Sequence, residues 1–217
     1  MSAPDLRPKQ KRSQETHDKF LVSLQNALKV KYFEHISIKE LAEGAGVSVG
    51  TFYRRFENKE ALLPLLYDAF GKELGQWIDQ MESAECHTLE QQVTLLCRST
   101  NDFLDARKSV FRTIHLNARL HSDTMFANPT LDRNEAYSRL SNLLLKFSPD
   151  NNDSVQVDLK KQQAADMAIY MLINSLLDKI LYPSLTPAIA CSMDQETFVT
   201  ELPQMLLNYL LPSFASQ

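Results

Sequence analysis

The sequence predicts an all-α protein of about nine helices, and three observations lead to this expectation. The strong apolar periodicities in the 217 residues follow the 3.6-residue repeat of a helix, as in the run Phe20, Leu24, Ala27 and Leu28. Five glycines and nine prolines are too few for the many turns of a sandwich or a barrel. An apolar content of 44% and a charged content of 23% are ordinary for a globular chain with a core.

Four helices are expected in the first 82 residues. Ser37 and Glu40 have the spacing of a capping box at the start of the second helix. Gly46 can take the left-handed conformation that ends that helix. Ser48 and Asn58 can cap the third and fourth helices, because their side-chain oxygens accept from free backbone amides. The expected ranges are 13–33, 37–45, 48–55 and 58–82.

The remaining helices are expected after residue 85. Thr88 and Gln91 resemble a second capping box, and Pro129 suits the first turn of a helix. Pro183 stops a long apolar helix, and Pro203 lies inside the last helix, where it favours a kink. The segments that carry these signals are 88–104, 108–120, 128–147, 158–182 and 193–212, with 148–154 as a loop.

The net charge of −4 conceals an asymmetry along the chain. Residues 1–60 carry +3 and residues 61–217 carry −7, with Arg7, Lys9, Lys11 and Arg12 in the first twelve residues. A basic arm on an acidic body predicts a polyanionic partner for the N-terminal part. The alternative is a solvated, disordered tail.

The first residues carry no apolar run of the kind found in a signal peptide. The apolar stretches also fall far short of the ~20 residues that span a bilayer. Cys86, Cys97 and Cys191 are odd in number and widely spaced, which favours reduced thiols over a disulfide framework. These features lead us to expect a cytoplasmic protein with no membrane partner.

The second and third expected helices have the spacing of a helix-turn-helix, with Gly46-Val47-Ser48 as the turn. Small residues such as Ala42 and Ala45 allow the two helices to pack closely. The second helix of such a unit enters the major groove of DNA with its N-terminal residues forward. The side chains expected there are Ser48, Val49, Gly50, Thr51, Tyr53 and Arg54. Tyr53 could instead be a core residue, although Phe52 and Phe56 already supply an inward face.

The segment "SIKELAEGAGVSVGTFYRRFENKEALL" closely resembles the N-terminal domain of the TetR (tetracycline repressor) family of bacterial regulators. The resemblance covers roughly residues 17–65. It is carried by Ser37, Leu41, Ala42, Ala45, Gly46, Val47, Ser48, Gly50, Thr51, Tyr53, Phe56, Lys59, Glu60 and Leu62. The rest of the chain resembles the family only in its length and helical pattern.

The resemblance implies that the third helix reads the major groove. It also implies that Lys59 grips a phosphate and that Ser37 and Lys39 lie beside the DNA backbone. A lysine at a helix start opposes the helix dipole, which is consistent with an external anion at Lys59. Residues 1–57 would then be an arm and DNA-binding domain, and residues 58–217 a sensing and dimerisation domain.

One departure from the family concerns the end of the first helix. The family usually has a glycine five residues before the position of Ser37, and this chain has Tyr32 there. A left-handed conformation costs a non-glycine residue about 1 kcal/mol. The first helix is therefore expected to end differently here. Gly44 is a second unusual residue, because it lies inside the second helix.

The resemblance also implies a ligand pocket and a dimer interface among the C-terminal helices. Wall residues of the pocket would be Trp77, Phe103, Phe111, His115, Tyr137 and Met167. The apolar faces of the last two helices would form a four-helix interface with a second copy through Ile169, Ile173, Leu176, Leu177, Ile180, Leu206, Tyr209 and Leu210. The alternative is that these side chains form a core within one chain.

No motif of a known catalytic or metal site is found. His115 and His121 are six residues apart, on different sides of a helix, and no Cys or His pair has zinc-finger spacing. We therefore expect no cofactor, no metal and no enzymatic activity. The sequence favours a homodimeric, ligand-responsive regulator that binds a palindromic double-stranded operator. The alternatives are a helical small-molecule-binding protein or enzyme, and a purely architectural nucleic-acid-binding protein.

Overall fold

The computed structural model describes residues 7–122, 132–149, 159–185 and 187–215, with side chains from Gln14 onward. Within these ranges the regular structure consists of nine α-helices and three short 3-10 helices, and no strand occurs. The all-α prediction is therefore confirmed. Pro129 and most of the expected loop at 148–154 lie outside the described residues.

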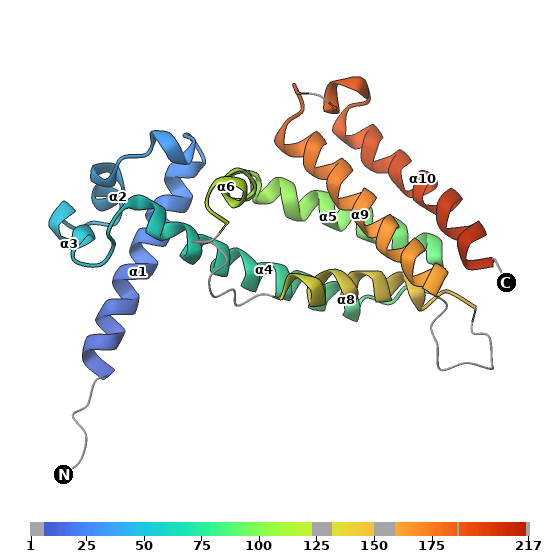
Figure 1. The fold of residues 1–217 in the computed structure, drawn as a ribbon, viewed down its shortest axis with the longest axis horizontal. Helices are drawn as coiled ribbons and strands as arrows, with labels where there is room; N and C mark the ends of the chain where they lie inside the picture. The colour runs from blue at the N-terminus through green and yellow to red at the C-terminus, as the bar shows by residue number, and fades with distance from the viewer. Residues whose placement is uncertain (1–6, 123–131, 150–158, 186, 216–217) are drawn as a thin grey trace, which may run out of the picture. The chain divides into compact units, whose positions relative to one another are not determined.

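Figure 1 shows the helices in chain order. Their bounds are α1 Arg7–Leu28, η1 Phe33–His35, α2 Ile38–Gly44, α3 Val49–Tyr53, η2 Lys59–Leu62, α4 Leu63–Ser83, α5 Leu89–Ala106, α6 Lys108–Leu120, α8 Arg133–Leu145, α9 Leu159–Leu181, η3 Ala188–Ala190 and α10 Gln195–Ala215. The first helix was expected to reach Phe33 but ends at Leu28. Phe33 is instead buried in η1, which the chain reaches through an intervening turn.

The chain forms two compact units. The first takes the chain up to Gly71 together with the segment from Ser109 that holds α6, and the second takes Lys72–Lys108 and the chain from Leu131 onward. Helix α4 thus begins in the first unit and continues into the second. These packing units differ from the division at residue 57 that the sequence led us to expect, because α6 packs with the N-terminal helices.

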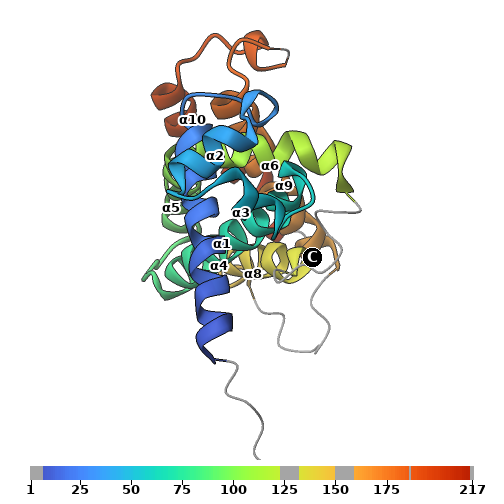
Figure 2. The same ribbon diagram turned by 90° about the vertical axis from the view of Figure 1, so that its left-hand side faces the viewer.

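An aromatic cluster forms the centre of the first unit. Phe20 of α1 meets Phe52 of α3 edge-on, with ring centroids 5.2 Å apart, and lies 5.7 Å from Phe56. Phe52 and Phe56 are themselves 5.2 Å apart. Figures 1 and 2 show α2 and α3 beside α1. The cluster holds α3 against α1, because aromatic pairs add to the free energy gained by burying their surface.

Helices α1 and α2 are in close contact at Gly44. A Cβ added there would lie 2.4 Å from Ser23 Oγ, which real side chains do not tolerate. Ser23 is buried and donates its hydroxyl to the carbonyl of Leu41 at 2.9 Å. The glycine that was unusual in the sequence is therefore explained by this contact between the helices.

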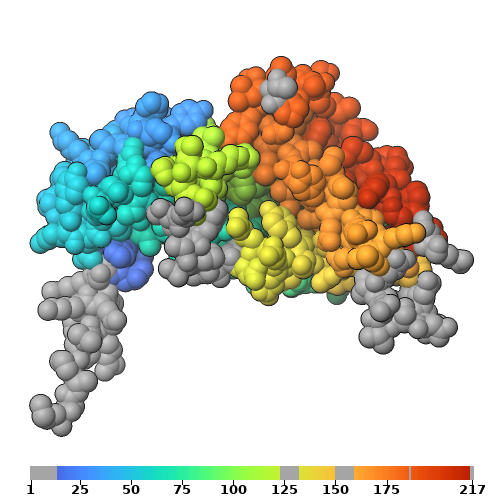
Figure 3. Space-filling model, viewed as in Figure 1, coloured from blue at the N-terminus to red at the C-terminus, as the bar shows by residue number. Residues whose placement is uncertain are grey.

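The second unit is built around α9. This helix packs against α8, α5 and α10, and α10 also packs along α5. Figures 1 and 3 show α9 and α10 side by side. The inward side chains are aliphatic and fully buried, as at Leu96, Leu176 and Leu210. In the described part of the chain, no helix is both long and apolar enough to cross a membrane.

Replacing Gly44 with alanine tests the contact between α1 and α2. The new methyl group would displace Ser23 from the Leu41 carbonyl, which should destabilise the protein by about 1–3 kcal/mol in denaturant unfolding. Gly75→Ala is the matched control, because a Cβ at Gly75 meets no atom within 4 Å. The control should be neutral or stabilised by about 1 kcal/mol, the helix propensity of alanine over glycine. Equal effects of the two substitutions would contradict this account.

Candidate nucleic-acid interface

The turn between α2 and α3 is a Schellman motif. The amide of Val47 donates to the carbonyl of Ala42, and the amide of Gly46 donates to the carbonyl of Glu43, both at 3.0 Å. Gly46 has a φ of +67° and is the only described residue with positive φ. The left-handed glycine predicted from the sequence is therefore confirmed. The motif satisfies carbonyls at the end of α2 and turns the chain directly into α3.

Helix α3 has one buried side and one exposed side. Phe52 is fully buried, whereas Val49, Gly50 and Tyr53 are exposed. The predicted cap is confirmed, because Ser48 Oγ accepts from the amide of Thr51 at 3.2 Å. The helix ends at Tyr53, so Ser48 and Arg54 lie at its caps and not within it.

Three polar side chains are connected along the exposed side of α3. The hydroxyls of Ser48 and Thr51 are 3.0 Å apart, and Arg54 donates from a guanidinium nitrogen to Thr51 Oγ1 at 2.9 Å. This Ser48–Thr51–Arg54 chain orders the guanidinium before any partner arrives. An arginine fixed in advance loses less conformational entropy when it binds an anion or a base edge.

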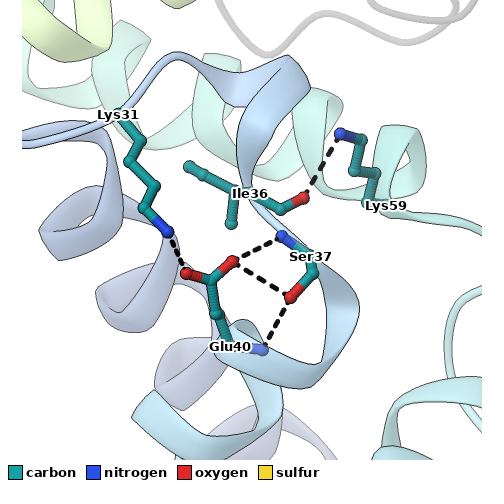
Figure 4. Close-up of polar contacts among 5 residues, drawn as sticks. All are labelled: Lys31, Ile36, Ser37, Glu40 and Lys59. Atoms are coloured by element: carbon teal, nitrogen blue, oxygen red, sulfur yellow. Dashed lines mark hydrogen bonds and ion pairs between the residues drawn. The ribbon is translucent and has the colours of Figure 1, made fainter.

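The start of α2 is held by a charged capping box, which Figure 4 shows. Ser37 Oγ accepts from the amide of Glu40 at 3.2 Å, and the Glu40 carboxylate accepts from the amide of Ser37 at 2.9 Å. Lys31 donates to the other oxygen of that carboxylate. The hydrogen bond from Lys31 and then those from Ser37 lower the pKa of Glu40 to about 2. The charge on Glu40 thus stabilises the cap above its ordinary pKa near 4.5, and this contribution is lost as the pH falls toward 2.

Lys59 lies at the start of η2 and points toward η1 (Figure 4). Its ammonium donates to the carbonyl oxygens of Phe33 at 3.0 Å, Glu34 at 2.8 Å and Ile36 at 3.3 Å. It also lies 4.9 Å from the centroid of the Phe33 ring. An ammonium has three N–H donors, so these carbonyls occupy all of them. Lys59 can bind a phosphate only by releasing one of the three.

The other residues predicted to contact DNA lie at the surface of the first unit. Lys39 is exposed on α2 and faces Glu43 of the next turn at 3.9 Å. Ser37 is exposed, but its hydroxyl is occupied by the capping box. Tyr53 is 59% exposed, so it is not a core residue, and among the described residues its ring makes an edge contact with Phe52 of the cluster.

Tyr32 shows how the chain leaves α1 without the usual glycine. Its backbone is extended, with φ −74° and ψ 151°, so no left-handed residue is required. The guanidinium carbon of Arg112 on α6 lies 4.0 Å from the centroid of the Tyr32 ring. Sequence reasoning missed both this contact and the Lys31–Glu40 pair. A lysine nine residues before a glutamate carries no local signal, and Arg112 is remote in sequence from Tyr32.

The second unit contains a shallow hollow between α4 and α5. Its volume is about 290 Å³, and its lining is Glu73, Gln76, Trp77, Gln80, Ser99, Asp102, Phe103 and Arg107. Trp77 and Phe103, two of the predicted pocket residues, meet there with ring centroids 5.3 Å apart. Trp77 Nε1 donates to Ser99 Oγ at 2.8 Å, and Arg107 pairs with Glu73. The volume is near the lower end of the range for small-molecule sites.

The other predicted pocket residues lie elsewhere. Phe111 packs against Phe70 within the first unit, with ring centroids 4.9 Å apart, and His115 lies on the same helix, α6. Tyr137 on α8 and Met167 on α9 are about half exposed in the second unit.

Among the described residues, no group of three or more His, Cys, Asp or Glu side chains could hold a metal ion. Burial raises the pKa of the Cys97 thiol to about 12, so it is protonated at neutral pH.

Most of the residues predicted for a dimer interface are buried within their own chain. These are Ile169, Leu176, Leu177, Ile180, Leu206 and Leu210, which pack in the core of the second unit. Ile173 is partly exposed, and Tyr209 is exposed. Helical periodicity alone cannot distinguish an inner face from an outer one when both carry apolar residues. The large apolar side chains that α9 exposes are Leu159, Met167, Tyr170 and Met171, and those that α10 exposes are Met205, Tyr209 and Leu211.

Comparison with known proteins finds a similarity in sequence that is confined to the N-terminal part of the chain. Residues 32–66 match the sequence profile of the bacterial regulatory proteins of the tetR family. The HTH-type transcriptional regulator EthR of Mycolicibacterium smegmatis is 42% identical over 59 residues. That alignment spans 27% of this chain and 27% of the relative, so it concerns little more than a quarter of either protein.

Solved structures extend the similarity in fold over nearly the whole chain. A tetR-family transcriptional regulator from Streptomyces coelicolor superposes with a TM-score of 0.65 at 15% identity, covering 93% of this chain and 83% of that one. The transcriptional regulator FadR from Bacillus subtilis, in complex with stearoyl-CoA, gives a TM-score of 0.56 at 16% identity, covering 91% and 98%. At these identities the comparison establishes the fold.

Lys59 should contribute to stability in the absence of any nucleic acid. Lys59→Met removes three hydrogen bonds from a charged donor to carbonyls of the segment before α2 and should destabilise the protein by about 1–3 kcal/mol. Lys39→Met is the control, because its exposed pair with Glu43 is worth less than about 0.5 kcal/mol. Both are measured by urea unfolding. If the two variants unfold at the same urea concentration, the carbonyl contacts do not stabilise the fold.

Proposed function

We propose that this chain is a transcriptional regulator of the TetR family and that it binds operator DNA through α3. The observation that carries the proposal is the two-sided construction of α3. Phe52 anchors one side in the core, and the Ser48–Thr51–Arg54 chain and Tyr53 lie on the other side. A helix held in this way presents its exposed side to the major groove.

We assign different roles to the exposed residues of α3. Val49, Gly50 and Thr51 have short side chains at the start of the helix, which allow close approach to base edges. Arg54 is positioned by Thr51 to donate to a guanine or to a phosphate. Tyr53 has an exposed hydroxyl suited to a phosphate oxygen. Lys39 and Ser37 lie at the start of α2, where phosphate contacts position the protein without reading sequence.

We propose that Lys59 supports this interface indirectly, by holding the backbone of the segment before α2. Its ammonium holds the carbonyls of the segment that leads into the Ser37 cap, so it fixes the start of α2 relative to the start of α4. A phosphate contact by Lys59 would require one of these hydrogen bonds to be exchanged. Loss of Lys59 should therefore weaken DNA binding mainly by loosening α2.

A second copy of the chain is the proposed partner of the second unit. Helices α9 and α10 lie side by side, and each leaves apolar side chains in solvent, including Tyr170 at 61% and Tyr209 at 45% exposure. Large apolar side chains on neighbouring helices mark a protein interface when they gather in one region. A two-fold dimer reads two half-sites, so we propose that the operator is a near-palindrome.

We further propose that a small molecule controls DNA binding from the second unit. The hollow at Trp77 and Phe103 is the candidate site, and a regulator of similar fold holds stearoyl-CoA. The hollow as described is too small for such a chain, so small polar ligands are the first probes, and acyl-CoA is a second probe suggested by that regulator. Trp77 is the only tryptophan, so its fluorescence reports on this site. If an effector weakens operator binding by a given factor, operator DNA must weaken effector binding by the same factor.

We expect no catalytic activity, which is consistent with a regulatory family. The proposal retains the expected functional division, with residues 1–57 as the DNA-binding part and 58–217 as the sensing and dimerisation part. The packing of α6 with the first unit adds one element of the sensing part to the DNA-binding unit.

DNA binding is tested by a gel shift with the DNA upstream of the protein's own gene. Arg54→Ala should weaken binding by about 1–3 kcal/mol and relax the preference at particular base pairs. Arg98→Ala is the control, because it removes the same charge from an exposed position on α5 in the second unit. If Arg54→Ala and Arg98→Ala behave alike, α3 is not the reading helix. If the unaltered protein binds this DNA no better than unrelated DNA, the operator proposal fails.

The dimer is tested with two glutamate substitutions on the same helix. Tyr170→Glu places a charge on the exposed side of α9, so it should give a folded protein at the monomer mass of 24.8 kDa in light scattering. Leu176→Glu places a charge in the core and should prevent folding, because an unpaired buried charge is costly. A Tyr170→Glu protein that remains a dimer at micromolar concentration would place the interface elsewhere.

A further inference from the structure

The segment Lys31–Ser37 joins α1 to α2 and is held by three other elements. Lys31 pairs with Glu40 of α2, and the carbonyls of Phe33, Glu34 and Ile36 accept from Lys59 of η2. The third contact comes from α6, where the Arg112 guanidinium lies over the ring of Tyr32 at 4.0 Å. We refer to residues 31–37 as the α1–α2 link.

The Arg112 contact acts at the start of this link. Tyr32 is the cap residue of η1 and directly precedes the buried Phe33. Phe33 and Ile36 are buried at either end of η1, and Ser37, the next residue, caps α2. The link is therefore short and anchored along its length. A displacement of Tyr32 passes through η1 to the cap of α2, because few residues lie between them to absorb it.

Among the described residues, no hydrogen bond joins Arg112 to Tyr32. Arg112 Nε is buried and has no hydrogen-bond partner in the described part of the chain, which is uncommon for a buried donor. Tyr32 remains 48% exposed. The interaction thus depends on the attraction between a guanidinium and an aromatic face, which is worth about 0.5–1.4 kcal/mol at a half-exposed site, or two- to ten-fold in an equilibrium constant. An interaction of this strength can order the link, and it can still be broken at a small cost in free energy.

We propose that Arg112 is a positioning residue for DNA binding, which acts through Tyr32 on the cap of α2. This inference rests on the proposed function of α3. This chain has Tyr32 where the family usually has glycine. The Tyr32 ring gives Arg112 of α6 an aromatic face to contact, and through this contact α6 orders the α1–α2 link. When Arg112 leaves the ring, the link loosens, and the Ser37–Glu40 cap becomes less ordered. Binding to DNA must then order the cap again, and the free-energy cost of doing so lowers the affinity for DNA.

The first test uses hydrogen exchange in the absence of DNA, on the full-length protein. The amides of Ser37 and Glu40, both hydrogen-bonded in the capping box, should exchange about two- to ten-fold faster in Arg112→Met and in Tyr32→Leu. Tyr32→Phe keeps the aromatic face and should exchange like the unaltered protein. Arg119→Met is the control on the same helix, because Arg119 is exposed and donates to the carbonyl of His115.

Two results of the exchange experiment would overturn the inference. One is unchanged exchange at Ser37 and Glu40 in both Arg112→Met and Tyr32→Leu. The other is a double variant whose acceleration equals the product of the two single effects, because two residues that act through one contact cannot add independently. A general loss of stability would instead accelerate exchange across the whole unit, including the amides of α3. That pattern would also contradict a role confined to the link.

The second test measures affinity for the upstream DNA well below the unfolding temperature. Arg112→Met and Tyr32→Leu should each weaken specific binding about two- to ten-fold. The salt dependence should stay the same, because no phosphate contact is lost. Weakened binding with a flatter salt dependence would mean that Arg112 touches DNA itself and would overturn the inference. If the unaltered protein fails to bind this DNA specifically, the proposed function fails, and the exchange experiment still decides whether Arg112 orders the link.

Discussion

A helix of five residues does not persist in water, because the hydrogen bonds of a single turn do not offset the entropy of forming it. Helix α3 has only the residues Val49–Tyr53, and it exists because Phe52 is buried against Phe20 and Phe56. The exposed side of α3 therefore depends on a contact made on the opposite side of the helix. The Schellman turn at Gly46 and the cap at Ser48 define where α3 begins, but the aromatic cluster supplies the stabilising free energy.

The link before α2 likewise depends on contacts with other elements of the unit. In place of a left-handed glycine, the chain uses an extended Tyr32 and a set of charged contacts from three helical elements. Lys59 and Lys31 are positive charges at the surface of the unit, and both are used to hold backbone or carboxylate oxygens of this link. The family resemblance assigned Lys59 to a phosphate, and in the structure its charge helps to hold the segment before α2.

Local features of the site were predictable from the sequence, whereas long-range contacts were not. The caps at Ser37, Ser48 and Asn58 and the left-handed Gly46 involve residues at most five positions apart, so each leaves a short pattern of residue types. The partners of Lys59 and Tyr32 lie far away in sequence, and a single sequence does not pair them. Six of the eight residues expected at a dimer interface are core residues, because α9 and α10 are apolar on more than one side.

The division of α3 into an anchored side and a free side bears on how such a protein can diverge. Gly50 and Tyr53 contribute no hydrogen bond from their side chains to the described fold, and a Cβ at Gly50 would meet only Ser48 Oγ, at 3.8 Å. Under the proposed function, substitutions at Gly50 can change the target sequence at little cost in folding free energy, whereas substitutions at Tyr53 alter a phosphate contact. Ser48 is different, since it both faces outward and caps the helix. Evolution of a new specificity is thus expected to leave Ser48 in place and to vary the positions around it.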